Sequence, residues 1–215
     1  METKTGPSRT RVTRRGMERK AQILQVATEK FLAHGFDGVS VDDIVLTVGG
    51  SKTNVYSYFG NKEGLFRAVI ESLCELFLRN FKKVNLSGKD ARTGLTLLGT
   101  TLLKSLMLDK HIAFQRLVLA ESGRFPGVGQ TWFDDGPQQS RLRIASFIAQ
   151  CQQSGQLRNA DPMISATLFH DMLVFNPTHL KTIGRPASAQ AVSRHVRQVV
   201  ELFIKGMDVQ NYRKL

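Results

Sequence analysis

The segment that decides the fold is Val41-Asp-Asp-Ile-Val-Leu-Thr-Val-Gly-Gly-Ser-Lys-Thr-Asn-Val-Tyr-Ser-Tyr-Phe-Gly-Asn-Lys-Glu-Gly-Leu-Phe66. Just before it, Ser40 followed by Asp43 is a capping-box pattern that starts a short helix. The glycines of Gly49-Gly50-Ser51 end this helix, and the serine can cap a second one over 52–59. The segment therefore predicts two short helices joined by a glycine turn.

Apolar residues at helical spacing continue on both sides of this segment. Upstream they predict a helix from Met17 to about His34, and downstream Asn61 caps a helix over 62–82, about 30 Å long at 1.5 Å per residue. Further helical segments are expected at about 91–108, 110–123, 137–154, 161–175 and 188–207. Because no strand-like alternation occurs, the predicted fold class is all-α.

A glycine-bearing turn between two short helices is the layout of a helix-turn-helix, whose second helix enters the DNA major groove. Val55 and Phe59 should pack inward. Asparagine can pair with adenine, while lysine and tyrosine reach phosphates. The predicted contacts are Ser51, Lys52, Thr53, Asn54, Tyr56, Tyr58 and Lys62, with Arg14 and Arg15 on a flexible basic arm over 1–16 that can follow a minor groove. The alternative is a tight helical hairpin whose tyrosines are packing residues.

Composition agrees with a polyanion partner. The 215 residues are 41% hydrophobic and 22% charged, with a net charge of +12. Residues 1–20 alone carry seven Lys or Arg against two Glu. No apolar run is long enough to span a bilayer and no signal peptide is present, so we expect a cytoplasmic protein. Cys74 and Cys151 form no metal motif, and we find no cofactor site, metal site or catalytic apparatus.

The stretch from about Arg19 to Phe66 resembles the N-terminal domain of the TetR family of bacterial transcriptional regulators. The resemblance lies in Ser40-Val-Asp-Asp-Ile44, Gly49-x-Ser-Lys52, Tyr56-x-Tyr-Phe59 and Asn61-Lys-Glu-Gly-Leu-Phe66. It implies that double-stranded operator DNA is the partner and that Ser40 also touches phosphate. Two departures stand out. Gly50 replaces a small apolar residue, which suggests a looser turn, and Thr53-Asn54 replaces the commoner glycine-threonine type pair.

The region from about 110 to 175 resembles the AefR-like subgroup of the same family, through Phe114-Gln-Arg-Leu-Val-Leu-Ala-Glu-Ser-Gly-Arg-Phe-Pro126, Trp132-Phe133, Gly136-Pro137 and Asp161-Pro162. The resemblance implies an effector-binding domain. Our candidate pocket residues are Leu117, Glu121, Phe125, Trp132, Phe133, Phe169, Met172 and Phe175. Glu121, His170 or Asn176 would supply the polar contacts. The alternative is that these aromatic and methionine side chains are plain core.

A homodimer is expected because reading a two-fold-related operator needs two recognition helices about 34–36 Å apart. The last two helices carry the apolar residues Ile164, Leu168, Met172, Phe175, Val192, Val196, Val199, Val200 and Phe203. These helices suit a four-helix interface with their symmetry mates. The alternative is that they are buried within one subunit.

The sequence thus predicts three parts: the arm over 1–16, a helix-turn-helix domain over 17–62, and a helical ligand-binding and dimerisation domain over 63–215. The favoured function is a homodimeric repressor released from its operator by a small apolar effector. One alternative is a DNA-binding regulator without a ligand. The other is an all-helical enzyme or lipid carrier.

Overall fold

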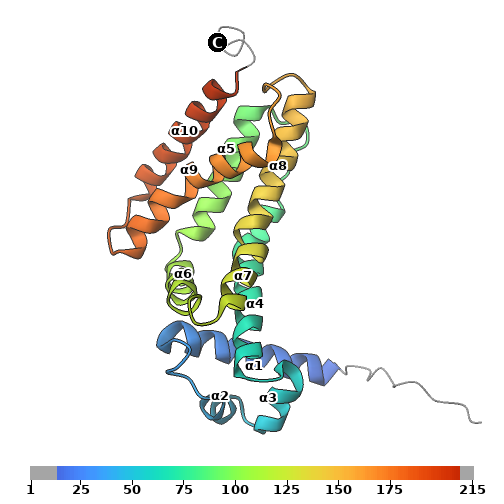
Figure 1. Cartoon of the computed structure of the whole chain (residues 1–215), viewed down its shortest axis with the longest axis vertical. Coiled ribbons are helices and arrows are strands. Elements are labelled where there is room, and N and C mark those ends of the chain that lie inside the picture. Colours follow the sequence, from blue (N-terminus) through green and yellow to red (C-terminus); the bar gives the residue numbers. More distant parts are fainter. Residues whose placement is uncertain (1–13, 209–215) are drawn as a thin grey trace, which may run out of the picture. The chain divides into compact units, whose positions relative to one another are not determined.

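The structure, a computed structural model, describes residues 14–208. This part of the chain holds no strand and ten α-helices (Figure 1). Their bounds are α1 Arg14–His34, α2 Val41–Val48, α3 Lys52–Phe59, α4 Lys62–Lys82, α5 Ala91–Leu106, α6 Asp109–Glu121, α7 Pro126–Asp135, α8 Pro137–Gln153, α9 Pro162–Thr182 and α10 Ala189–Gly206. The all-α prediction is confirmed.

The chain forms two compact units that divide between Val69 and Ile70, within α4. Unit 1 contains α1 to α3 and the first turns of α4, and unit 2 contains the rest of α4 and all later helices. The division falls inside the long helix, whereas the expected boundary lay at its start. Residues 1–13 of the expected arm lie outside the described residues, and Arg14 to Gly16 belong to α1.

Unit 1 is organised around three aromatic rings. Phe66 of α4 meets Phe31 of α1 and Phe36 edge-on, with 5.1 Å between centroids in each pair. All three side chains are buried, and so are Ile44 of α2 and Val55 of α3. Edge-to-face aromatic pairs add to the stabilisation from apolar burial. This shared core fixes α2 and α3, which lie on the same side of α1 in Figure 1.

Unit 2 packs α5, α8, α9 and α10 around one apolar core. Phe169 of α9 meets Phe203 of α10 edge-on at 5.1 Å, and both are buried with Leu98 and Ile148. Helices α5 and α8 approach closely at Gly94, where an added Cβ would lie 2.0 Å from Cζ of Phe147. The glycine is therefore required by packing rather than by backbone conformation.

Two features of unit 2 correct the expected helix pattern. Helix α7 lies between the segments expected at 110–123 and 137–154 and was not predicted, although Pro126 at the first helical position suits a helix start. Helix α9 continues past its expected end at 175 and through Pro177. Proline lacks the N–H that would bond the Leu173 carbonyl. His195 of α10 takes this role, with its Nε2 3.0 Å from that oxygen.

Candidate DNA interface and ligand cavity

Helix α3 presents the residues expected to read DNA on its outer surface. Ser51, Lys52, Thr53 and Asn54 are exposed, Tyr56 is 43% exposed and Tyr58 is half-buried. Val55 packs inward as expected, whereas Phe59 is only partly buried, with the Lys20 ammonium 5.5 Å from its ring centroid. The exposed first turn of α3 also carries unpaired backbone N–H groups of the kind that attract anions.

Both lysines that were expected to bind phosphate, Lys52 and Lys62, contact another side chain of unit 1. The Lys52 ammonium lies 2.8 Å from a carboxylate oxygen of Asp42, and this hydrogen-bonded pair raises the pKa of Lys52. The Lys62 ammonium lies 4.2 Å from the ring centroid of Phe36. Both side chains of the Lys52–Asp42 pair are more than half exposed, so this ion pair contributes little to stability and can be broken at little cost.

Arg19 of α1 closes the turn between α2 and α3. Its Nη1 donates to the Val48 carbonyl oxygen at 2.9 Å and its Nη2 donates to the Gly49 carbonyl oxygen. Gly50 has φ +89°, and an added Cβ would lie 2.6 Å from Arg19 Nη2. The guanidinium therefore occupies the space of the small side chain expected at position 50. The expectation of a looser turn rested on missing packing at position 50, and the Arg19 contact fills that space.

The helix starts next to the turn follow the expected capping chemistry in part. Ser40 and Asp43 form the predicted capping box: the Asp43 N–H donates to Ser40 Oγ at 3.0 Å, and the Ser40 N–H donates to Asp43 Oδ2 at 2.9 Å. The hydrogen bonds from Ser40 lower the pKa of Asp43. Asn61 caps α4 by accepting from the Gly64 N–H at 2.7 Å. The Ser51 side chain makes no such bond to α3.

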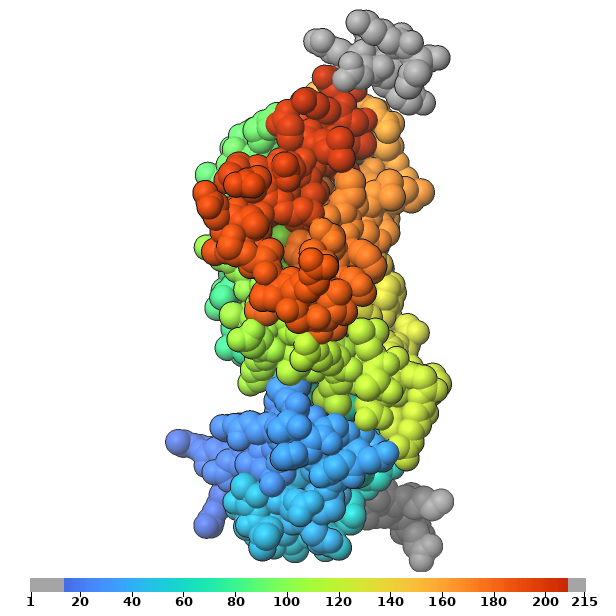
Figure 2. Space-filling view, turned by 90° about the vertical axis from the view of Figure 1, so that its left-hand side faces the viewer, coloured from blue at the N-terminus to red at the C-terminus, as the bar shows by residue number. Residues whose placement is uncertain are grey.

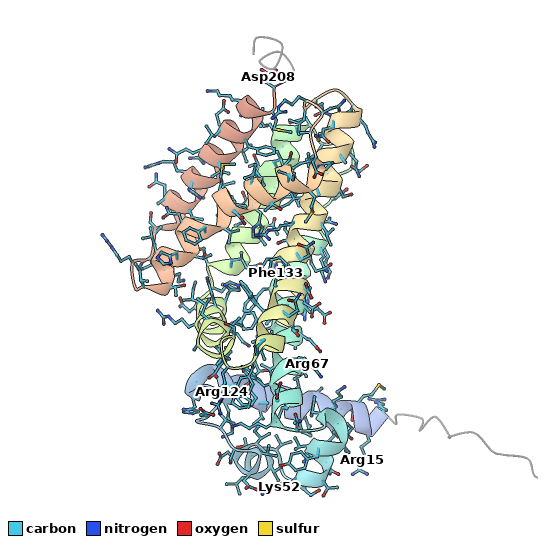
Figure 3. The ribbon with its side chains drawn as sticks, in the orientation of Figure 1. Arg15, Lys52, Arg67, Arg124, Phe133 and Asp208 are labelled. Atoms are coloured by element: carbon cyan, nitrogen blue, oxygen red, sulfur yellow. The ribbon has the colours of Figure 1, made fainter. Side chains whose placement is uncertain are left out.

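The two arginines assigned to the arm lie on the exposed first turn of α1. Arg14 pairs with Glu18 one turn later at 2.9 Å, and both side chains are largely exposed. Arg15 lines a shallow polar hollow in unit 1 together with Arg19, Asn54 and Tyr58 (Figure 3 labels Arg15). The hollow brings two cations of α1 beside two predicted base-reading and phosphate-reading side chains of α3.

Unit 2 contains a partly open cavity of about 380 Å³. This volume lies within the range of about 300–1,000 Å³ that small-molecule sites occupy. Helices α4 to α9 all contribute to its wall. The apolar side chains of the wall are Phe77, Leu78, Leu102, Leu106, Phe114, Trp132, Phe133, Pro137, Val174 and Phe175. Phe133 is labelled on α7 in Figure 3. The wall is rich in aromatic rings.

Three of the eight predicted pocket residues line this cavity: Trp132, Phe133 and Phe175. The other five do not. Leu117 is buried elsewhere in α6, Phe169 belongs to the core of unit 2, and Met172 lies at the surface. Glu121 and Phe125 are also absent from the wall. Helical spacing identifies an apolar face but not what that face meets, so these five assignments are wrong for this cavity.

The polar groups of the wall gather on three helices. On α9, Asp171 accepts from Nη2 of Arg141 at 2.7 Å and lies 3.0 Å from Nδ1 of His170. On α6, burial lowers the pKa of His111 to about 4, so this imidazole is neutral near pH 7. The sequence offered His170 as one possible polar contact but passed over His111, Gln115 and Arg141.

The cavity also contains Cys74, whose burial raises its pKa to about 12. Its Sγ lies 3.9 Å from the Trp132 carbonyl oxygen. Such a thiol is a poor nucleophile, because the reactive thiolate is scarce at neutral pH. Within residues 14–208 no cluster of three metal-ligating side chains occurs, and no helix there is long and apolar enough to cross a membrane.

The outer face of α9 carries a strip of exposed apolar side chains: Ile164 is 63%, Leu168 59% and Phe175 68% exposed, with Met172 between them. Figure 2 shows α9 and α10, in orange to red, side by side on one face of unit 2. On α10, Val196, Val199, Val200 and Phe203 are buried within the subunit, which was the stated alternative for these residues. Leu202 is the exposed large apolar residue of α10.

Two family models match the chain. Residues 23–69 match the model of bacterial regulatory proteins of the tetR family. Residues 93–206, more than half of the chain, match the C-terminal domain of AefR-like transcriptional repressors. Both resemblances seen in the sequence motifs are thereby confirmed.

Curated relatives such as RutR and ComR match less than a third of the chain. The regulator RutR of Escherichia coli K12 is 36% identical over 64 residues, which are 30% of each protein. The repressor ComR of the same organism is 39% identical over 54 residues, 25% of this chain and 26% of that protein. The chain therefore matches less than a third of the length of these relatives.

Solved structures match nearly the whole chain. A TetR-family regulator from Mesorhizobium loti MAFF303099 is 26% identical with a TM-score of 0.77, covering 92% of this chain and 100% of that one. FrrA, a flavonoid-responsive regulator, is 27% identical with a TM-score of 0.79, covering 90% and 98%. With both family models matched in order along one chain, the protein belongs to the TetR family of DNA-binding transcriptional regulators.

Proposed function

We propose that the protein is a homodimeric repressor that leaves its operator when a small, mainly apolar molecule fills the cavity of unit 2. The observation that carries this proposal is the cavity itself, about 380 Å³ with an aromatic wall. FrrA, which has a similar structure, is described as flavonoid-responsive, and this supports the same class of regulator here.

Operator reading is assigned to the exposed face of α3. Asn54 and Thr53 would face base edges, and Lys52, Tyr56 and Tyr58 would face phosphates. In a dimer, two copies of α3 would meet successive major grooves about 34–36 Å apart. The exposure of Lys52, Thr53, Asn54 and Tyr56 beside the turn that Arg19 contacts supports this assignment.

The dimer interface is assigned to the outer face of α9. Ile164, Leu168 and Phe175 recur at helical spacing and are each more than half exposed. Contiguous exposed apolar surface of this kind marks an interaction site in soluble proteins. Because the valines of α10 are already buried in the subunit, α10 would contribute mainly Leu202.

Coupling between ligand and DNA is assigned to α4. The helix places Leu65 and Phe66 in the core of unit 1 and Phe77 and Leu78 in the cavity wall. A ligand that displaces the wall residues would move the same continuous helix that anchors the DNA-reading unit. Such coupling usually amounts to about 1–3 kcal/mol, or roughly a 5- to 150-fold change in operator affinity.

Two alternatives compete with this proposal. A regulator without a ligand needs no cavity with an aromatic wall, so the cavity argues against it. Family membership favours a regulator over the all-helical enzyme or lipid carrier.

The test is fluorescence anisotropy of the full-length protein against DNA flanking its own gene, with shuffled DNA as the control, at several salt concentrations. We expect selective binding that weakens with salt. Tyr56→Ala should abolish it without loss of the dimer, and Lys110→Ala, on an exposed site of unit 2, should not. Equal affinity of the Tyr56→Ala variant and the native protein would refute the assignment of α3.

A further inference from the structure

The cavity wall contains three buried polar atoms without a hydrogen-bond partner in the described part of the chain. They are Nδ1 of His111, Oε1 of Gln115 and Nε of Arg141. One further such atom, Nε of Arg143, lies outside this cavity. Buried polar groups are normally paired, so their concentration at one cavity indicates where a partner binds.

Two of the three atoms are acceptors on one side of the cavity. His111 and Gln115 are four residues apart on α6, which places them on one face of the helix. A neutral imidazole has one N–H and one lone pair. The Leu106 carbonyl raises the pKa of His111, and we assign the N–H to Nε2 and the lone pair to the unpartnered Nδ1. The Gln115 carbonyl oxygen also accepts. This side of the cavity therefore requires hydrogen-bond donors from a ligand.

The third atom is a donor and comes from another helix, α8. Arg141 of α8 already gives Nη2 to Asp171, which leaves Nε–H for an acceptor. The other polar side chains of the wall are satisfied: Ser140 donates to the Pro137 carbonyl and Thr178 to the Val174 carbonyl, each at 2.8 Å.

The charges of the wall cancel. Arg141 is the cation and Asp171 the anion, 2.7 Å apart, while burial keeps His111 neutral and lowers the pKa of His170. No uncompensated cation in this wall is available for a carboxylate, and no uncompensated anion for an ammonium group. A charged ligand would lose its hydration without gaining an ion pair.

The aromatic side chains around these atoms indicate that the rest of the ligand is apolar. Phe77 contacts His111 edge-on at 4.8 Å and stacks against Phe114 at 5.9 Å between centroids. Trp132 and Phe133 form the wall contributed by α7. Planar aromatic ligands gain both apolar burial and ring contacts from such a wall.

We propose that the effector is an uncharged aromatic molecule that donates hydroxyl or N–H groups to His111 and Gln115, one to each, and accepts a hydrogen bond from Arg141. This inference rests on the proposed function, because it names the ligand of that cavity. The ligand class follows from which atoms lack partners and from the cancelled charge.

The test compares matched probes on two-ring scaffolds, biphenyl and naphthalene. Each scaffold is used unsubstituted and with a hydroxyl, methoxy, carboxylate or aminomethyl group. Calorimetry with the full-length protein gives the affinities, and the fluorescence of Trp132, the single tryptophan, locates binding at the cavity. We expect the hydroxyl compound of a scaffold to bind about tenfold more tightly than its methoxy and unsubstituted partners.

The double variant His111→Phe/Gln115→Leu should lose this preference while still binding the unsubstituted ring. Gln150→Leu, at an exposed site outside the cavity, is the matched control and should keep the preference. Tightest binding of a carboxylate or ammonium probe, an unchanged preference in the double variant, or no binding of any probe would each overturn the inference.

Operator anisotropy measured with the same probes separates this inference from the proposed function. Hydroxyl-selective binding that leaves operator affinity unchanged would refute release by ligand but keep the ligand class. Release of DNA without a preference for the hydroxyl compounds would refute the ligand class but keep the release mechanism.

Discussion

Gly50→Ala tests whether Arg19 sets the geometry of the DNA-reading turn. The substitution has two costs in the structure. The backbone at φ +89° disfavours a side chain by about 1–2 kcal/mol. The new Cβ, 2.6 Å from Arg19 Nη2, also expels the guanidinium from the Val48 and Gly49 carbonyls. For these two bonds of a half-buried arginine we take about 1 kcal/mol each, below the usual range for charged partners.

The expected total is therefore about 3–4 kcal/mol for Gly50→Ala and about 2 kcal/mol for Arg19→Ala. Gly50→Ala already breaks the two Arg19 hydrogen bonds. The double variant should therefore lose about as much stability as Gly50→Ala alone. This corresponds to a coupling energy of about 2 kcal/mol, within the range measured for contacting residues. Gly60→Ala is the matched control, since Gly60 has φ +80° and no neighbour within 4 Å of the added Cβ.

Hydrogen exchange of a peptide spanning 40–60 measures these costs locally, because about 1.4 kcal/mol changes protection tenfold. Gly50→Ala should speed exchange by two to three orders of magnitude, and adding Arg19→Ala should change it little. Gly60→Ala should reduce protection by the same factor whether position 19 holds arginine or alanine. If the effects of Gly50→Ala and Arg19→Ala simply add, Arg19 does not close the turn.

Three further predictions follow from single contacts. Lys52→Ala should make the salt dependence of operator binding shallower by about two units of slope per dimer, because one phosphate contact per subunit is lost; an unchanged slope would remove Lys52 from the interface. Gly94→Ala should lower the melting temperature through a cost of about 1–3 kcal/mol, since its Cβ would lie 2.0 Å from Phe147, whereas Gly123→Ala, with nothing within 4 Å, should not. Burial lowers the pKa of His111 to about 4, so the unfolded chain binds the proton first as pH falls. As the pH falls from 7 to 4, the native protein should therefore lose about 3 kcal/mol of stability relative to His111→Phe, measured by urea unfolding. A constant difference between the two proteins would contradict a buried neutral imidazole.

The local elements of unit 1 could be predicted because their signals lie close together in the sequence. Ser40 and Asp43 are three residues apart, and the two glycines directly follow the helix that they end. The role of Arg19 could not be found this way, because its carbonyl partners are about thirty residues further along. The only local sign was an unexplained glycine at position 50.

The errors in unit 2 have the same origin. Judged from its local sequence, Pro177 should end the helix. In the structure, His195 of α10 lies within hydrogen-bond distance of the Leu173 carbonyl that the proline leaves free, and the proline ring is buried. Helix α7 was missed because Pro126 and its neighbouring glycines resemble a turn. In each case the tertiary contact, rather than the propensity of the segment, decides the local structure.

The cavity shows why ligand chemistry is harder to predict than ligand location. In the sequence, His111 and Gln115 are ordinary polar residues of an amphipathic helix, and only three of eight predicted pocket residues reach the cavity. These two residues matter because each has one buried acceptor atom, His111 Nδ1 and Gln115 Oε1, without a hydrogen-bond partner. A wall of leucine and phenylalanine would pack there without this desolvation cost. A site with unpaired acceptors instead penalises every ligand that cannot donate to them, so the same two atoms that weaken the empty cavity provide its discrimination between hydroxylated and plain aromatic compounds.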